Sequence, residues 1–415
     1  MKSQRIHGLD TLRALAIMLV FANHYMGFVT NEPTFGVFSE LGWMGVDLFF
    51  ALSGYLIGNQ IFAGLREGGF SLRNFYARRL LRTLPNYYVV LALYAFWPLF
   101  AGTAPHAPWW KYWTFTLNFE LIPGTRFSHA WSLCVEEQFY LLLPAVVLLV
   151  ALMRAPLRLG WCIIAASLAA GMVLRALAWQ DLQPPADGNA RAYTDIYYAT
   201  WARFDELIVG VTLALLKNHH AVAWKRLTSM GNTMFAGGLA VTASACWYFL
   251  DGHFGFGQTV FGYPLLGLGF GMLLLAALSP GSLLARIRVP GAASIALWSY
   301  AIYLTHKQLC IILARHFERH FGWAADGPLV IGLLIAASVL AGFLLYILVE
   351  TPFMRLRERF VPTNSARRMY EEVDGRSSGS DDRVAAGAGA AGGPVREDGG
   401  DQPQAGPERR VREGV

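Results

Sequence analysis

The chain has 415 residues, of which 55% are hydrophobic and only 15% are charged, and it contains 13 Trp and 27 Phe. This composition is too apolar for an ordinary soluble domain of this length and favours an integral membrane protein. The net charge of +6 does not indicate nucleic-acid binding, because the basic residues gather in short connections between apolar segments.

Apolar runs of roughly 20 residues recur along most of the chain, and each could cross about 30 Å of hydrocarbon as a helix. The runs are continuously apolar rather than alternating, which excludes a barrel. We therefore predict an all-α integral membrane protein with about ten transmembrane helices and no soluble domain. The predicted spans are 12–29, 41–63, 80–101, 133–153, 159–179, 199–216, 233–250, 258–279, 294–312 and 328–349.

Basic residues concentrate in alternate connections, from Lys2 and Arg5 before the first span to Arg355, Arg357 and Arg359 after the last. Cytoplasmic connections are enriched in Lys and Arg, so both termini are predicted to be cytoplasmic. A cleaved signal peptide is the alternative for the first run. It is disfavoured because no small-residue cleavage site follows.

The first predicted helix carries ionisable groups that are costly in a membrane. Arg13 and His24 are eleven residues apart, which puts them within about 20° around a helix and roughly 16 Å apart along it. This spacing predicts a cation near the cytoplasmic end of a cavity and an imidazole, suited to proton transfer, deep within it. A hydrogen-bonded structural His24 is the alternative. Asp10 is a further possible cavity-lining residue.

In the second predicted helix, Asp47, Ser53, Gly54 and Tyr55 interrupt the apolar pattern. Gly54 would permit close helix approach and Ser53 could hydrogen-bond across it, so packing is the default interpretation and cavity lining a possible role for Ser53.

Arg79 and Arg82 follow in the next basic connection, three residues apart at a predicted helix start. Guanidinium groups bind phosphate through forked hydrogen bonds, so the pair suits a nucleotide-bearing donor such as coenzyme A. Membrane topology alone would also supply arginines here.

The long outer connection 102–132 contains Trp109, Trp110 and Trp113. Anchoring at the membrane interface is favoured over stacking on a sugar ring.

The fourth predicted helix opens with Glu136 and Glu137, which point about 100° apart. Glu136 shares a stripe with Ser132 and Tyr140 and is expected to face a cavity, whereas Glu137 is expected to pair with a cation on another helix. A carboxylate here could orient a histidine or accept a proton from a hydroxyl group. A purely structural role is the alternative.

Later polar positions inside apolar runs are interpreted first as structural ion pairs or hydrogen bonds, with Tyr303 and His306 as possible cavity-lining residues on one helix face. The four cysteines have no CxxC spacing and are predicted to be packing residues, and no metal site is predicted. These later polar positions are Asp205, Glu206, Tyr303, His306, Lys307 and Glu350.

After Phe360 the composition shifts abruptly to Gly, Ala, Asp, Glu, Arg and Ser. Such a segment cannot bury a core. We therefore predict a membrane domain over 1–360 and a disordered cytoplasmic tail over 361–415.

These segments, in this order, resemble the acyltransferase-3 family of membrane O-acyltransferases over about residues 5–360. The family's Arg-x10-His pattern corresponds to Arg13 and His24. The departures are Cys134 before VEEQFY and Lys307 after His306. The matching segments are RIHGLDTLRALAIMLVFANHY, GVDLFFALSGYLI, FYARRLLRTLP, WSLCVEEQFYLLLP, RFDELIVG, SYAIYLTHKQL and VETPF.

The resemblance implies that an acyl group, usually acetyl from acetyl-coenzyme A, passes to a hydroxyl of a surface polysaccharide, lipid-linked sugar or related glycan in the bacterial cell envelope. It implies no bound cofactor, a multi-pass location in the inner membrane, and His24 as the essential catalytic group, as general base or as acyl carrier. Arg13, Arg79 and Arg82 would hold the donor.

A rival interpretation is a multi-helix exporter or flippase of a sugar-containing substrate, which would move its substrate without consuming acyl-coenzyme A. A receptor or structural membrane protein leaves Arg13, His24 and the Glu pair unexplained. A longer donor such as succinyl-coenzyme A and any oligomeric state stay open.

Overall fold

A computed structural model of the chain describes residues 6–182 and 190–362. Those residues form helices joined by turns and loops, with no strand, so the predicted all-α class is confirmed. The predictions that fall on Lys2, Arg5 and the tail from residue 363 lie outside the described residues.

The ten longest helical regions match the ten predicted spans in position, although several bounds differ. They are α1 (His7–Tyr25), α3 (Met44–Arg66), α4 (Leu72–Phe96), α7 (Trp131–Leu152), α8 (Leu157–Asp181), α10 (Asp205–His219), α12 (Gly231–Leu250), α13 (Tyr263–Ala277), α15 (Ala292–Phe321) and α16 (Pro328–Leu345).

Short elements connect these helices. Four are π-helical turns: η1 (Met26–Thr30), η3 (Tyr193–Tyr197), η5 (Gln258–Gly262) and η6 (Tyr346–Glu350). The others are α2 (Val37–Glu40), α5 (Pro98–Ala101), α6 (Trp109–Trp113), η2 (Ser128–Ala130), α9 (Ala190–Ala192), η4 (Thr200–Ala202), α11 (Ala221–Ser229), α14 (Leu283–Arg286) and α17 (Thr351–Phe360).

Seven helices of the described part are long and apolar enough to span a membrane, or eight if the bent pair of α10 and α11 is one span. The count of about ten is therefore not confirmed. α4 and α15 fall outside the seven, because α4 carries several arginines and α15 carries Tyr303, His306 and Lys307 within its length.

α4 begins eight residues before its predicted start. Ser71 caps the helix, since its side-chain oxygen accepts a hydrogen bond from the backbone N–H of Asn74 at 3.3 Å. Arg79 and Arg82 consequently lie two turns or more inside α4 and not at its first turn.

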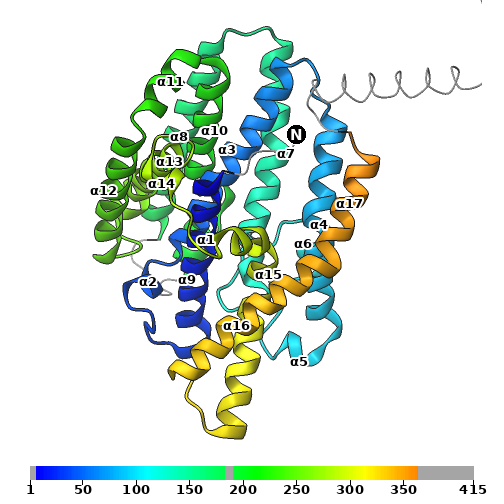
Figure 1. The fold of residues 1–415 in the computed structure, drawn as a ribbon. Helices are drawn as coiled ribbons and strands as arrows, with labels where there is room; N and C mark the ends of the chain where they lie inside the picture. Colours follow the sequence, from blue (N-terminus) through cyan, green and yellow to red (C-terminus); the bar gives the residue numbers. More distant parts are fainter. Residues whose placement is uncertain (1–5, 183–189, 363–415) are drawn as a thin grey trace, which may run out of the picture. The chain divides into compact units, whose positions relative to one another are not determined.

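Long helices run back and forth between two sides. The connections from α3 to α4 and from α7 to α8 lie at one side, at the top of Figure 1, and the connection from α15 to α16 lies at the other. The first of these sides, where the chain enters α4, is called here the basic side because Arg73, Arg78 and Arg79 lie near it.

α3 and α10 pack against each other at very short range. A Cβ atom on Gly54 would lie 2.0 Å from the carbonyl oxygen of Leu207, and one on Gly210 would lie 2.2 Å from that of Ala51. Only glycine fits at these two positions, so the helices can approach at backbone distance. α1 contacts α3 on one flank and α15 on another, which places it at the centre of the domain (Figure 1).

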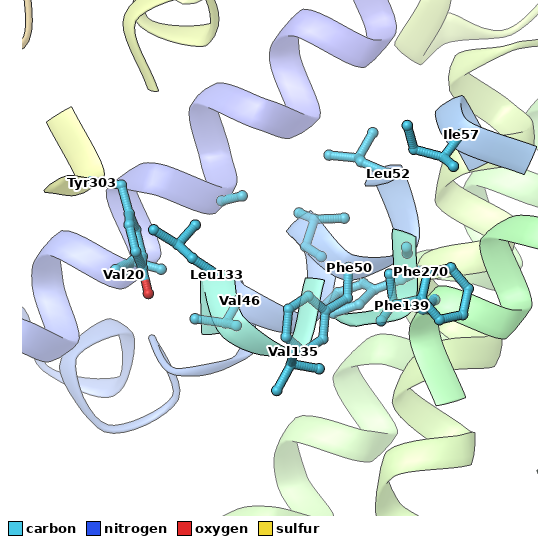
Figure 2. Packing of buried hydrophobic residues seen from close by; sticks show 14 of the residues in the cluster. Val20, Val46, Phe50, Leu52, Ile57, Leu133, Val135, Phe139, Phe270 and Tyr303 are labelled. Atoms are coloured by element: carbon cyan, nitrogen blue, oxygen red, sulfur yellow. The ribbon is translucent and has the colours of Figure 1, made fainter. Parts of the chain in front are cut away.

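The buried core joins these helices. Figure 2 shows Val20 of α1 and Leu133 of α7 near Tyr303 of α15, with Phe50 and Phe139 farther along the same cluster. This packing holds α1, α7 and α15 together around the polar residues described next.

Candidate active site

A cavity of about 150 Å³ lies among α1, α3, α4, α7, α15 and η6, and we call it the central pocket. Eight of the residues singled out from the sequence as site candidates line it: Arg13, Ser53, Arg79, Arg82, Glu136, Glu137, Tyr140 and Tyr303. Asp10, His24 and His306 do not line it.

Three arginines face the central pocket. The Arg79 Nη2 atom lies 3.3 Å from Glu137 Oε1, and its guanidinium carbon lies 3.1 Å from the centre of the Tyr140 ring. Within the described part of the chain, neither Arg13 nor Arg82 has a carboxylate oxygen within ion-pair distance. These two cations are therefore available to an anionic ligand.

Three carboxylates border the same pocket. Glu137 pairs with Arg79 on α4, and Glu136 Oε1 accepts a hydrogen bond from the Ser53 hydroxyl at 2.9 Å. Glu350 accepts one from the Asn86 side chain at 2.9 Å. Glu350 is the last residue of the π-helical turn η6, and such turns are frequent at functional sites.

His24 lies near the far end of α1 from Arg13, next to His306 of α15. The His24 Nδ1 and His306 Nε2 atoms are 2.8 Å apart, and the two rings are stacked with centroids 5.0 Å apart. The second nitrogen of His306, Nδ1, lies 2.9 Å from the carbonyl oxygen of Ile302.

These contacts determine the tautomers of the two neutral rings. A carbonyl oxygen can only accept, so His306 Nδ1 carries a proton and its Nε2 does not. His24 Nδ1 must then donate to His306 Nε2, which leaves His24 Nε2 unprotonated. His24 Nε2 is therefore ready to take a proton or to attack an electrophile.

Tyr303 links the central pocket to His24. Its hydroxyl donates to the His129 carbonyl oxygen at 2.6 Å and accepts from the Ser132 hydroxyl at 2.7 Å. Both Tyr303 and Ser132 line the pocket, and the Tyr303 ring centroid is 6.4 Å from that of His24. The pocket thus extends from the three arginines to a wall that borders the imidazole.

Two further basic side chains complete the group around His24. The His129 ring centroid lies 5.8 Å from that of His24, and Lys307 Nζ donates to Ser128 Oγ at 2.9 Å and lies 3.7 Å from the centre of the Phe28 ring. His129 was not predicted from the sequence, because it lies in the short 3-10 helix η2 before α7, outside the predicted spans. Lys307 was interpreted from the sequence as a structural ion-pair or hydrogen-bonding residue and as a departure from the family, and not as part of the site.

A separate buried group, called here the sealed cluster, contains Asp47, Arg175, Arg203, Asp205 and Glu206. Arg203 pairs with Asp47 and Arg175 pairs with Asp205, and all five residues are buried. None lines the central pocket. The structural interpretation of Asp205 is consistent with this pairing. Its arginine partner was not predicted, although a basic residue inside an apolar run is itself a signal.

No set of three or more His, Cys, Asp or Glu side chains in residues 6–182 and 190–362 could hold a metal ion. The imidazole, carboxylate and guanidinium groups at the site are suited to proton transfer, nucleophilic attack and binding of anions.

Residues 6–347 match the acyltransferase-3 family, which is described as an acyltransferase domain. A protein of Staphylococcus aureus (strain COL), provisionally named an O-acetyltransferase, is 25% identical over 388 residues, covering 85% of this chain and 58% of that protein. A Bacillus subtilis (strain 168) protein, provisionally named a peptidoglycan O-acetyltransferase, is 29% identical over 241 residues, covering 54% of this chain and 35% of that protein.

The peptidoglycan O-acetyltransferase of Listeria monocytogenes serovar 1/2a (strain ATCC BAA-679 / EGD-e) is 28% identical over 229 residues, covering 51% of this chain and 34% of that protein. The chain thus spans less than two thirds of the length of each of these relatives. No solved structure matches it significantly. The family match covers most of the chain and includes His24, His306 and every lining residue of the central pocket except Glu350, so this membrane protein carries an acyltransferase domain and belongs to the acyltransferase-3 family.

Proposed function

We propose that the chain transfers an acetyl group from acetyl-coenzyme A to a hydroxyl of a cell-envelope glycan. The observation that carries this proposal is the continuity of the central pocket, which has Arg13, Arg79 and Arg82 at its lining and ends at Tyr303 beside His24. Arginines suit the phosphates of coenzyme A, and an imidazole with a free nitrogen suits acyl transfer.

The orientation of the domain in the membrane is assigned from the position of its basic side. Cytoplasmic connections are rich in Lys and Arg, so we assign the basic side to the cytoplasm, both termini included. Acetyl-coenzyme A would enter there with its phosphates at Arg13 and Arg82. The thioester would then reach toward His24, which lies about 16 Å farther along α1 than Arg13. The membrane would be the bacterial inner membrane.

The reaction we propose uses His24 as a general base. His24 Nε2 takes the proton of the acceptor hydroxyl while the hydroxyl oxygen attacks the thioester carbonyl carbon. The bond between that carbon and sulfur breaks, and the thiolate takes the proton from His24. The products are an O-acetyl ester and free coenzyme A, and His24 returns to its starting form.

His306 and Lys307 would support this step. The hydrogen bond from His24 Nδ1 to His306 holds the ring with Nε2 available. The Lys307 ammonium, which has no carboxylate partner in the described residues, adds positive charge near the position where the oxyanion develops.

The class of acceptor that we propose is taken from the names of the relatives. Two of the three are named as peptidoglycan O-acetyltransferases, so peptidoglycan glycan strands are the first acceptor to test. We also propose that residues 1–360 form the whole catalytic domain and that 361–415 are dispensable for transfer.

The decisive experiment uses the purified chain in nanodiscs with radiolabelled acetyl-coenzyme A and peptidoglycan glycan strands. His24→Ala is expected to lower transfer by about a hundredfold to ten-thousandfold, because general-base catalysis is lost. His316→Ala is the matched control, since His316 lies exposed on the same long helix as His306. Transfer that survives in His24→Ala would refute the assigned role, and a wild-type protein that consumes no acyl-coenzyme A would refute the function.

A further inference from the structure

A second cavity, of about 460 Å³, lies on the side of the domain opposite the basic side. It is formed by two connections, the one between α4 and α7 and the described part of the one between α8 and α10. We call it the outer groove. Its main side chains are Trp110, Lys111, Asn118, Glu120, Asp195 and Trp201.

The charges at the rim place the outer groove outside the hydrocarbon. The Glu120 side chain is 88% exposed, and Arg191 and Asp195 form an ion pair of 3.7 Å with both partners exposed. Exposed charges of this kind are too costly in the hydrocarbon core. The groove therefore opens to water or to the headgroup layer.

Its aromatic surface is large and accessible. Trp110 is 59% exposed and Trp201 is 46% exposed, and the Trp201 ring is stacked on Phe119 with centroids 6.2 Å apart. Flat aromatic faces with carboxylates beside them suit the apolar face of a sugar ring and its hydroxyl groups.

The charged side chains of the outer groove and its rim do not favour a phosphate as ligand. Lys111 Nζ lies 3.1 Å from Glu120 Oε2 and donates to the Phe119 carbonyl oxygen at 2.8 Å, and Arg191 is paired with Asp195. Both cations already face carboxylates. The Glu120 and Asp195 oxygens still have lone pairs that can accept hydrogen bonds from hydroxyl groups.

One segment borders both the outer groove and the central pocket. Phe115 lines the central pocket, whereas Thr116, Asn118 and Phe119 line the groove. Gln138 of α7, the residue after Glu137, fixes this segment, since its Nε2 donates to the Phe115 carbonyl oxygen at 2.7 Å and to Asn118 Oδ1 at 2.9 Å.

We propose that the outer groove is a saccharide-binding subsite that holds a sugar unit of the acceptor chain while another unit is acylated. The proposal rests on the proposed function for the identity of the acceptor. Among the three tryptophans of the outer connection, it assigns sugar binding to Trp110 alone and leaves Trp109 and Trp113 outside the groove.

The test compares Trp110→Ala and Trp201→Ala with Trp113→Ala in the full chain in nanodiscs. Trp113 is the matched control, because it is 65% exposed on the same short helix as Trp110 and does not line the groove. The probe is a soluble oligosaccharide of alternating N-acetylglucosamine and N-acetylmuramic acid. Its Kd is measured by calorimetry and its KM as acceptor is measured with labelled acetyl-coenzyme A.

Each groove variant is expected to raise the oligosaccharide Kd and KM by about fivefold to tenfold, with the donor KM unchanged. Trp113→Ala is expected to stay within about twofold of the wild type. Glu120→Gln keeps the shape of the groove and should also weaken the oligosaccharide, so the proposal remains testable if Trp201→Ala does not fold.

The outcomes separate the two proposals. Wild-type transfer with the same acceptor KM in Trp110→Ala, Trp201→Ala and Trp113→Ala would overturn the groove and leave the proposed function standing. Oligosaccharide binding that depends on Trp110 and Trp201, in a protein that consumes no acyl-coenzyme A, would support the groove and overturn the proposed function. A wild-type protein that neither binds nor acetylates the oligosaccharide would overturn the groove.

Discussion

In the described part of the chain, arginines and carboxylates meet at two places in the interior of the helical domain, the sealed cluster and the central pocket, and the two places differ in access. In the sealed cluster Arg175 and Arg203 are completely buried, each has its own aspartate, and the Arg203 guanidinium carbon lies 4.3 Å from the centre of the Tyr263 ring. No ligand can reach these charges without unpacking the helices around them.

In the central pocket the same residue types stay accessible. The side chains of Arg79 and Glu137 are 14% and 17% exposed, and Arg13 and Arg82 border the cavity without a carboxylate in ion-pair distance in the described residues. The comparison teaches that residue type alone does not identify a site in a membrane protein. Buried charges that form ion pairs with each other stabilise the fold, whereas charged side chains that border a cavity without such a partner are available to a ligand.

The largest effect on stability is expected from breaking one pair of the sealed cluster. Arg203→Met leaves the Asp47 carboxylate buried without its partner, which should lower the free energy of unfolding by about 3–5 kcal/mol. Unfolding of the purified variant in mixed detergent measures the loss. The double variant Asp47→Leu with Arg203→Met should recover most of it, and equal instability of both variants would show that packing, not charge, is decisive.

A smaller effect of a different kind is expected from Arg82. Arg82→Met removes a cation that forms no ion pair with a carboxylate among the described residues, so stability should change little, whereas the KM for acetyl-coenzyme A should rise by about tenfold to a hundredfold. Steady-state kinetics with the acceptor in excess measure the change. Arg288→Met is the control, because Arg288 is exposed on the same basic side and does not line the pocket. An unchanged donor KM in Arg82→Met would contradict donor binding at this arginine.

How much of this site could be predicted from the sequence depends on the distance along the chain. Arg13 and His24 lie on one helix, so periodicity predicted that they share a face, but of the two only Arg13 lines the central pocket. The contact of His24 with His306 joins residues 282 positions apart, and it exists only because α15 packs against α1. Periodicity predicts which face of a helix is polar but not which helix covers it.

The fold was predictable to a similar extent. Continuous apolar runs predicted the helices, and the structure has a helical region at each predicted position. The number of spans could not be predicted in the same way. α4 and α15 are less apolar than the other long helices because they carry polar residues, several of which line the central pocket. The outer groove could not be predicted from helical periodicity either, since the connections between the long helices, and not the long helices themselves, bring Trp110 and Trp201 together.

The smallest effect is expected from the ion pair of Arg79 and Glu137. This pair lies in the central pocket, but its two charges face each other as they do in the sealed cluster. This pair is partly exposed, so water screens it, and Glu137→Gln should raise the donor KM by no more than about fivefold. The Arg79 guanidinium would keep its place on the Tyr140 ring, since the cation–π contact does not depend on Glu137.

Glu136→Gln is the matched comparison, because Glu136 lies in the same pocket and accepts from the Ser53 hydroxyl but forms no ion pair among the described residues. If Glu136 takes part in proton movement, its variant should lower kcat more than Glu137→Gln does, with little change in the donor KM. A larger loss of kcat in Glu137→Gln than in Glu136→Gln would assign proton movement to Glu137 instead of Glu136. It would mean that the ion pair opens during the reaction, so that the charge paired with Arg79 in this structure acts in the chemistry and not only in the fold.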